Sequence, residues 1–565
     1  MRDGVKLYTA VYVPKGRTGF PILMERTPYG SGPYGKGMPE LPSLYARAGY
    51  AFVYQDVRGT FESEGTFVNI RPQLKPGEKG IDESTDTYDS IDWLVKRVKG
   101  NNGRVGMRGI SYPGFYAAAG ALSRHPALKA VSPQAPCADW FVGDDVHHNG
   151  AFFVQDNFDF SALFGFDIPR KGPETDHPGM DIPRPKGAYA FYLDAGTAEG
   201  LEKKYFKGRS PYWNELVEHD TYDAYWKARA VPPEMRDVRC AVLNVGGLFD
   251  AEDMWGALNV YAATERQNPA IENVLVMGPW SHGQWDGPAS SLAGMRWGMD
   301  TGAWYQEHVE FPFFERALRG VGSALPEATI FETGANRWRT FAEWPPKGLT
   351  PSAIYLSGAH GLASSMPVEA GGDAYVNDPD APTPYLADPA ANERPGDLLA
   401  RDEGWAARRA DVMTYVGEPL AKATTLAGPV DVDLWIETTG TDGDFVVKLL
   451  DIAPQGEPHA GEMRAVREDV MRGRFRNSLS KPEAIVSGAP TEIRMTMNSV
   501  LHTFKPGHRM AVQVQSSWFP LVDRNPNRYV PNIERAKPGD FQKATVTVLR
   551  GGKTASAIRF GVLEK

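Results

Sequence analysis

Strand-like and helix-like segments alternate along residues 1–136, and this alternation constrains the fold more than any other feature of the chain. Ile22-Leu23-Met24 and Ala51-Phe52-Val53-Tyr54 are short apolar runs of the kind that buried strands carry. Residues 88–98 instead repeat apolar side chains at helical spacing, and Gly100 ends the repeat. Strands that alternate with helices in this way are typical of a parallel sheet covered by helices. We therefore predict an α/β domain.

The 565 residues exceed what one hydrophobic core organises, so we expect more than one domain. Residues 137–229 are rich in aromatic residues, Asp and Pro, with short helical stretches near 200–205 and 222–229. We interpret residues 137–229 as a helical cap inserted into the sheet domain. Strand patterns return after Cys240, and the α/β core is therefore predicted in two parts, residues 1–136 and 230–346.

The remaining part of the chain, residues 347–565, loses long helical periodicity. Short alternating runs such as 430–436 and 509–514 are separated by turn residues, which is typical of a β-sandwich. We predict a jelly-roll domain here. Residues 376–398, rich in Pro, Asp and Ala, are expected to form an extended loop.

The composition limits the kinds of partner. The net charge is −9 and Lys and Arg form no cluster, which argues against nucleic acid and against an anionic membrane surface. No apolar run is long enough to span a bilayer. Only Cys137 and Cys240 are present, without a Cys/His cluster, so we expect no metal or other cofactor, and two reduced, buried thiols rather than a disulfide. A small molecule or a short peptide is the expected substrate.

The start of the chain shows no signal peptide, because Met1 is followed almost at once by the strand-like segment 5–12. The sequence leaves the compartment and the oligomeric state open.

The sharpest motif is Gly109-Ile110-Ser111-Tyr112-Pro113-Gly114, which lies between a predicted strand at 104–107 and a predicted helix at 115–123. A nucleophile elbow needs this context, because a tight turn from strand to helix exposes the serine oxygen and small flanking residues let the two elements approach. Pro113 is compatible with the first turn of a helix. The alternative is a Gly-rich turn with an ordinary serine.

A serine nucleophile in this kind of fold is followed along the chain by an acid and then by a histidine. Asp250 comes shortly after the predicted strand 241–245, and His282 shortly after the predicted strand 274–277. Open α/β sheets place their sites at such carboxyl ends of strands. Ser111, Asp250 and His282 are therefore the predicted triad, although a single histidine among 11 is more often structural.

These motifs resemble those of the cocaine esterase/X-prolyl dipeptidyl peptidase superfamily: Ser111 in GISYPG, Asp250 in GLFDAEDMWG and His282 in GPWSH. The similarity extends to RTPYG (26–30), QDVRG (55–59), NNGRVGM (101–107), VGDDVHHNGAF (142–152) and the C-terminal β part. Within the superfamily, the chain is most similar to α-amino acid ester hydrolases, which act on α-amino esters and β-lactam antibiotics. The resemblance implies an α/β-hydrolase core, a helical cap and a jelly roll, and members are often exported and often oligomeric.

Two tyrosines and three acids are further candidate site residues. The backbone N–H of Tyr112, directly after the nucleophile, is expected to stabilise the oxyanion, and the resemblance adds the hydroxyl of Tyr29. The resemblance also implies that Asp145, Glu252 and Asp253 hold the substrate's α-ammonium group. Without the resemblance, we would interpret Tyr29 as an aromatic residue in a loop that packs on the cap. The acids would then be helix caps, or would interact favourably with a helix dipole.

Two residues depart from the α-amino acid ester hydrolase pattern, which has Ser where this chain has Ile110 and Glu where it has Pro113. They flank the nucleophile, so the preferred acyl group is open. The predicted function is a serine hydrolase that cleaves α-amino acid esters or amides, including β-lactam-type substrates, through an acyl-enzyme. The alternatives are an X-prolyl dipeptidyl peptidase or a general carboxylesterase with the same triad, and a catalytically inert protein whose jelly roll binds a carbohydrate or polymer.

Overall fold

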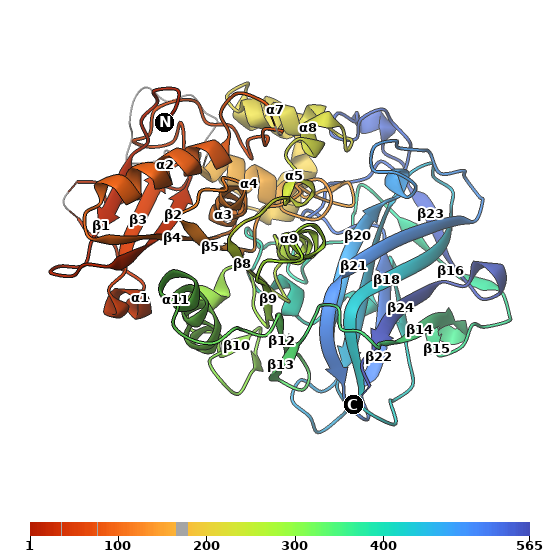
Figure 1. Cartoon of the computed structure of the whole chain (residues 1–565). Coiled ribbons are helices and arrows are strands. Elements are labelled where there is room, and N and C mark those ends of the chain that lie inside the picture. The colour runs from red at the N-terminus through yellow and green to blue at the C-terminus, as the bar shows by residue number, and fades with distance from the viewer. Residues whose placement is uncertain (36, 76, 165–178, 565) are drawn as a thin grey trace.

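A nine-stranded sheet forms the centre of the N-terminal half of the chain (Figure 1). The computed structural model describes residues 1–35, 37–75, 77–164 and 179–564. The strand order is β1-β3-β2-β4-β5-β8-β9-β12-β13, parallel throughout except for the pairs β1/β3 and β12/β13 at the two edges. The bounds of the strands are β1 Thr9–Tyr12, β2 Phe20–Thr27, β3 Ala51–Asp56, β4 Asn101–Ile110, β5 Leu128–Gln134, β8 Ala241–Gly247, β9 Asn273–Gly278, β12 Ala328–Glu332 and β13 Arg337–Phe341.

Both faces of this sheet are covered, which explains why its strands read as continuous apolar runs. Successive residues point to opposite faces, and Ile22 and Met24 belong to a different buried cluster from Leu23. Figure 1 shows α2 and α3 on one side of the sheet and α1 and α11 on the other. The helices of this half are α1 Ser43–Ala48, α2 Glu83–Arg97, α3 Tyr112–Ala121, α9 Met254–Gln267, α10 Thr301–Tyr305 and α11 Phe311–Arg319.

The segment between β5 and β8 is an insertion rich in helices. Its described helices are α4 Val154–Phe164, α5 Gly187–Ala195, α6 Ala198–Leu201, α7 Pro211–Glu218 and α8 Ala224–Lys227. Phe158, Phe206 and Trp213 are fully buried and pack against one another at its centre. The two helical stretches predicted here correspond to α6 with the π-helical turn Glu202–Phe206, and to α8. Helices α4, α5 and α7 were not predicted, although α7 buries Tyr212, Trp213, Leu216 and Val217 at helical spacing.

The C-terminal part is rich in β-structure, as predicted. The strands from β14 to β24 form one eleven-stranded hydrogen-bonded network, and the described helices beyond residue 346 are short 3₁₀ turns. The long strand β18 alternates buried and part-exposed residues over most of its length, as the sequence pattern indicated. The bounds are β14 Thr350–Ser357, β15 Gly361–Ala363, β16 Gly371–Asn377, β17 Val412–Val416, β18 Thr424–Thr438, β19 Asp444–Ile452, β20 Met463–Arg472, β21 Thr491–Phe504, β22 Arg509–Gln515, β23 Ala544–Arg550 and β24 Ala557–Val562.

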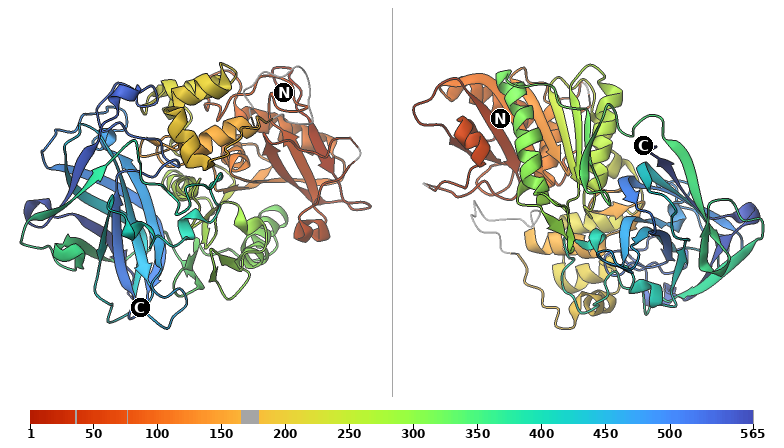
Figure 2. Two further views of the ribbon diagram at one scale, coloured as in Figure 1. Left: turned by 180° about the vertical axis from the view of Figure 1, so that it is seen from behind. Right: turned by 90° about the horizontal axis from the view of Figure 1, so that it is seen from below.

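The β-rich part lies beside the α/β part, on the side away from β1 (Figure 2). After β16 the chain runs without helix or strand until the 3₁₀ turn at Leu398–Ala400, close to the extended loop predicted for residues 376–398. Cys137 and Cys240 are buried and unpaired, as predicted. Among the described residues, no helix has both the length and the apolar character needed to cross a bilayer.

Candidate active site

Ser111 occupies the turn between β4 and α3. Its φ is +66° and its ψ is −129°, a conformation that L-residues rarely adopt and that marks a nucleophile elbow. The backbone N–H of Ser111 donates to the carbonyl oxygen of Gln134 at 2.9 Å. A Cβ atom on Gly109 would lie 2.3 Å from the carbonyl oxygen of Pro113, and one on Gly114 would lie 2.5 Å from that of Gln134. The glycines are therefore required by the close approach of strand and helix.

Asp250 and His282 lie beyond the carboxyl ends of β8 and β9, where the sequence indicated them. Nδ1 of His282 is 2.9 Å from Oδ2 and 3.2 Å from Oδ1 of Asp250. Asp250 is buried, and its Oδ1 also accepts hydrogen bonds from the backbone N–H groups of Glu252 at 2.8 Å and Asp253 at 3.1 Å. Because a carboxylate can only accept, the proton of a neutral His282 lies on Nδ1 and leaves Nε2 as the basic atom.

The loop that carries His282 adjoins the elbow. A Cβ atom on Gly283 would be 3.8 Å from Cγ2 of Ile110. Gln134 joins the two segments, since its carbonyl oxygen accepts from Ser111 and its Oε1 accepts from Nε1 of Trp285 at 2.7 Å. Among the described residues, His282 and Ser111 form no side-chain hydrogen bond. Catalytic contacts of this kind often tighten only when substrate binds.

Nε2 of His282 faces a second carboxylate, because Oε2 of Glu252 lies 3.5 Å away. Burial by itself would lower the pKa of His282, but the negative charges of Asp250, Glu252 and Asp145 outweigh it and raise the pKa to about 10. Burial would likewise raise the pKa of Asp250, yet the charge and hydrogen bond of His282 lower it. Asp250 and His282 therefore stabilise each other in their charged forms.

Asp145, Glu252 and Asp253 meet beside His282. The N–H of Asp145 donates to the carbonyl oxygen of Glu252 at 3.3 Å, and its Oδ2 accepts from Nε1 of Trp140 at 2.9 Å. Burial and then the charge of Glu252 raise the pKa of Asp145 to about 6, while burial and the charge of Asp145 raise that of Asp253 well above its ordinary value. Carboxylates crowded in this way favour a bound cation.

Cys137 completes this group. Its Sγ is 3.7 Å from Oδ2 of Asp253, and ligand atoms of Cys137, Asp145 and Asp253 lie within 4.8 Å of one another. The other oxygen of Asp253, Oδ1, is buried without a hydrogen-bond partner among the described residues. The neighbouring Asp144 has a structural role, because it accepts from the N–H groups of Ala138, Asp139 and Gly256.

The two tyrosines expected to bind the oxyanion lie next to each other. The rings of Tyr29 and Tyr112 meet edge to face with centroids 6.4 Å apart. The hydroxyl of Tyr112 is engaged with Asn69 and with the N–H of Ile70, so only its backbone is available to substrate. Burial, and then the charges of Cys137 and Asp145, raise the pKa of Tyr29, which keeps its hydroxyl protonated as a donor.

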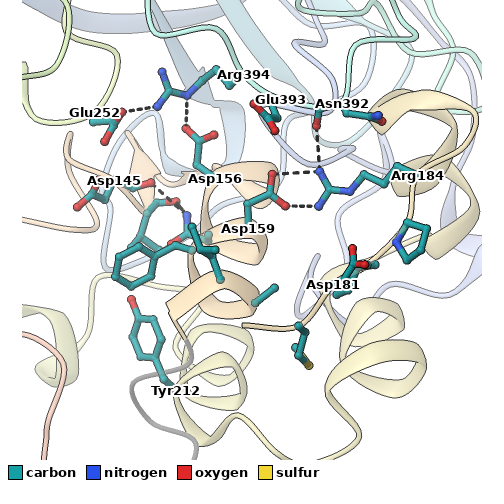
Figure 3. A pocket seen from close by; sticks show the side chains of 18 of the residues that line it. Asp145, Asp156, Asp159, Asp181, Arg184, Tyr212, Glu252, Asn392, Glu393 and Arg394 are labelled. Carbon is teal, nitrogen blue, oxygen red and sulfur yellow. Dashed lines mark hydrogen bonds and ion pairs between the residues drawn. The ribbon is translucent and has the colours of Figure 1, made fainter. Parts of the chain in front are cut away.

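A cavity of about 630 Å³ opens beside the acids (Figure 3). Asp145, Glu252 and Tyr212 contribute to its wall, together with α4, the segment 180–184 and residues 392–394 of the β-rich part. Figure 3 shows Arg394 between Glu252 and Asp156, and Arg184 against Asp159. Sequence reasoning missed Arg394, because it lies in an extended loop far from its partners and no local pattern distinguishes it.

Comparisons with known proteins agree with this architecture. The model of the family described as X-Pro dipeptidyl-peptidase (S15 family) matches residues 3–284, and that of the X-Pro dipeptidyl-peptidase C-terminal non-catalytic domain matches residues 319–559. Cocaine esterase of Rhodococcus sp. (strain MB1 Bresler) is 29% identical over 546 residues, covering 93% of this chain and 91% of that protein.

Several solved structures are similar over the whole chain, and two of them share more than 30% identity with it. An aminopeptidase from the marine sediment archaeon Thaumarchaeota archaeon has 35% identity and a TM-score of 0.94, covering 100% of this chain and 95% of that one. An α-amino acid ester hydrolase has 38% identity and a TM-score of 0.92, with the same coverage. The chain therefore belongs to the cocaine esterase/X-Pro dipeptidyl-peptidase (CocE/NonD) superfamily, whose members act on small ester or peptide substrates, and it is a serine hydrolase.

Proposed function

We propose that this serine hydrolase cleaves, and can transfer, the acyl groups of α-amino acid esters and amides, including β-lactam-type substrates. One observation carries the proposal: Asp145, Glu252 and Asp253 surround His282 although Asp145 lies far from the other two in sequence. The similarity to an α-amino acid ester hydrolase at 38% identity supports it.

In the proposed mechanism, Oγ of Ser111 attacks the carbonyl carbon while Nε2 of His282 takes its proton. The resulting oxyanion accepts hydrogen bonds from the N–H of Tyr112 and the hydroxyl of Tyr29. Collapse of the tetrahedral intermediate breaks the bond to the alcohol or amine, which leaves with the proton from His282. Water then attacks the acyl-enzyme by the same steps and releases the acid. Asp250 orients the imidazole and stabilises its charged form.

The carboxylates would bind the α-ammonium group of the substrate. Asp253 is fully buried, and its Oδ1 has no hydrogen-bond partner in the described part of the chain. Leaving such an oxygen unsatisfied costs about 1–3 kcal/mol, so a cation that donates to it is strongly favoured. Burial, and then the charges of neighbouring acids, raise the pKa values of Asp145 and Asp253, and an ammonium group would offset both effects.

The experiment compares an α-amino ester with the matching des-amino ester. Charge-assisted hydrogen bonds contribute about 1.5–3 kcal/mol, so Asp145→Asn should lower kcat/KM for the amino ester by at least about tenfold and leave the des-amino ester nearly unchanged. Glu393→Gln removes a charge from the same cavity without touching the cluster, and serves as the control. Equal losses on both esters would mean that the acids support the fold or the triad, which leaves a general carboxylesterase.

A second candidate is an X-prolyl dipeptidyl peptidase, which the matching family model favours. Release of a chromogenic amine from an X-Pro-amide, measured against a single-residue amino amide, separates the two. Faster cleavage of the X-Pro compound would select the peptidase. The catalytically inert alternative is excluded, because the chain is a serine hydrolase.

We further propose the finer architecture: an α/β-hydrolase core at residues 1–136 and 230–346, a helical cap at 137–229 and a jelly roll at 347–565. The helices from α4 to α8 and the strands from β14 to β24 support these boundaries. A homo-oligomer is consistent with the family resemblance, and light scattering of the purified protein measures it.

A further inference from the structure

Arg394 belongs to the β-rich part of the chain, and its side chain lines the cavity beside the candidate active site. Its side chain is 12% exposed, and its Nε is 2.7 Å from Oδ2 of Asp156 on α4. Its Nη2 contacts Oε1 of Glu252, and Figure 3 shows the guanidinium group between the two acids. One residue of the C-terminal part thus holds one of the proposed ammonium ligands.

Glu252 stands between two cationic groups. While Oε1 is bound by Arg394, Oε2 lies 3.5 Å from Nε2 of His282. Nδ1 of His282 is already bonded to Asp250, so Nε2 is the atom that has to receive the proton of Ser111. A small movement of Glu252 toward the imidazole would shorten this 3.5 Å contact to a hydrogen bond with Nε2 and block that transfer.

The surroundings of His282 make such a movement favourable. Asp250, Glu252, Asp253 and Asp145 face the imidazole, and Tyr29 and Cys137 lie beside Asp145. The negative charges of Asp250, Glu252 and Asp145 stabilise the imidazolium form, which cannot accept a proton. Among the described residues, Arg394 is the arginine that pairs with one of these acids, Glu252, whereas Arg184 is paired with Asp159 further along the cavity.

We propose that Arg394 is a positioning residue of the reaction: it holds the carboxylate of Glu252 on the side of Asp156 and so prevents it from moving closer than 3.5 Å to Nε2 of His282. This inference rests on the proposed triad. The α-ammonium group of a bound substrate attracts Glu252 in the same direction, so an amino ester both fills the pocket and frees the base. Selectivity for amino esters is then expressed in kcat as well as in KM.

The test measures kcat/KM for the des-amino ester against pH, because this substrate brings no ammonium of its own. Without Arg394, the uncompensated Glu252 stabilises the imidazolium, so the acidic limb moves to higher pH. Arg394→Met should shift its midpoint upward by at least one pH unit and lower kcat/KM at neutral pH by about tenfold, with recovery at high pH. Arg394→Lys, which keeps the charge, should restore much of the wild-type profile. Arg401→Met, which breaks an exposed ion pair with Asp397 in the same loop, is the matched control and should leave the midpoint in place.

A double variant distinguishes the effect of the lost charge from a loss of folding. In Arg394→Met combined with Glu252→Gln, the carboxylate that faces Nε2 is removed, so the midpoint should return toward that of the wild type. A loss of activity that is equal at every pH, or a midpoint that stays high in the double variant, would overturn the inference.

Different experimental results would contradict the proposed function itself. A wild-type enzyme with no preference for the amino ester refutes the ammonium pocket, whereas the des-amino pH profile still tests Arg394. Activity that survives in Ser111→Ala removes the triad, and with it the inference.

Discussion

Ser111 is held in a backbone conformation that costs on the order of 1–3 kcal/mol for a residue with a side chain. Its N–H bonds to Gln134 and its carbonyl oxygen accepts from the N–H of Phe115 at 3.0 Å, so the surrounding strand and helix maintain the strain. A glycine at this position would adopt the same angles without that cost.

Two substitutions at Ser111 therefore separate chemistry from stability. Ser111→Ala and Ser111→Gly should both lose activity and labelling by a serine-directed phosphonate, as mass spectrometry of the intact protein would show. Ser111→Gly should be more stable than Ser111→Ala by about 1 kcal/mol in urea unfolding. Full labelling of either variant would move the nucleophile elsewhere.

His282 links stability to pH. Its pKa is about 10 in the folded protein and about 6.5 in an unfolded chain, so the folded state binds the proton more tightly. The stabilisation is fully present below about pH 6.5 and is lost as the pH rises through about 10.

The advantage of the wild type over His282→Gln in free energy of unfolding should consequently shrink between pH 6 and pH 10. Urea titrations of both proteins across this interval measure it. An advantage that stays constant over the whole interval would show that His282 does not carry a raised pKa.

At the scale of elements, the contact between α3 and β5 depends on Gly114. A Cβ atom there would approach the carbonyl oxygen of Gln134 to 2.5 Å, and neither partner is the end of a flexible side chain. Gly114→Ala should push α3 away from the sheet and cost about 1–3 kcal/mol, with loss of activity because the elbow precedes α3. Thermal unfolding and ester hydrolysis measure the two effects. Gly539→Ala, whose Cβ would meet nothing within 4 Å, is the control, and an equally small effect at Gly114 would contradict the packing argument.

The elements around this contact were largely predictable from the sequence, whereas the cavity wall was not. The strand, the serine turn and the Ala-rich helix follow one another without interruption, so local pattern and chain order indicated Ser111, and strand ends indicated Asp250 and His282. Asp145 and Tyr29 needed the family resemblance, because their neighbours in sequence show no catalytic pattern. Arg394 is defined only by contacts with acids on α4 and after β8, which no local signal encodes.

At the scale of the whole molecule, buried clusters join the two halves, and one of them lies beside Asp250. It includes Phe249 and Leu258 from the α/β part and Leu398 and Trp518 from the β-rich part. In addition, Nη1 of the buried Arg467 donates to the carbonyl oxygen of Leu248 at 2.9 Å, just before Asp250. Separating the halves would expose this apolar surface and break the hydrogen bond from Arg467 to Leu248.

We therefore expect the halves to unfold together. Differential scanning calorimetry should show one transition whose calorimetric and van't Hoff enthalpies agree. Trp518→Ala, which opens the shared cluster, should lower the temperature of that single transition. Two resolved transitions in the wild type would mean that each half is stable without the other.

The insertion between β5 and β8 delays the formation of the sheet while the chain is being synthesised. Strand β5 cannot pair with β8 until the intervening residues have been synthesised. The strands from β8 to β13 of this sheet can therefore form only after the insertion has been made. The residues proposed to act on the substrate are all present once His282 has emerged, but Arg394 and Arg467 arrive much later. We expect a nascent chain to remain inactive, with an incomplete binding site, until most of the C-terminal half has been made.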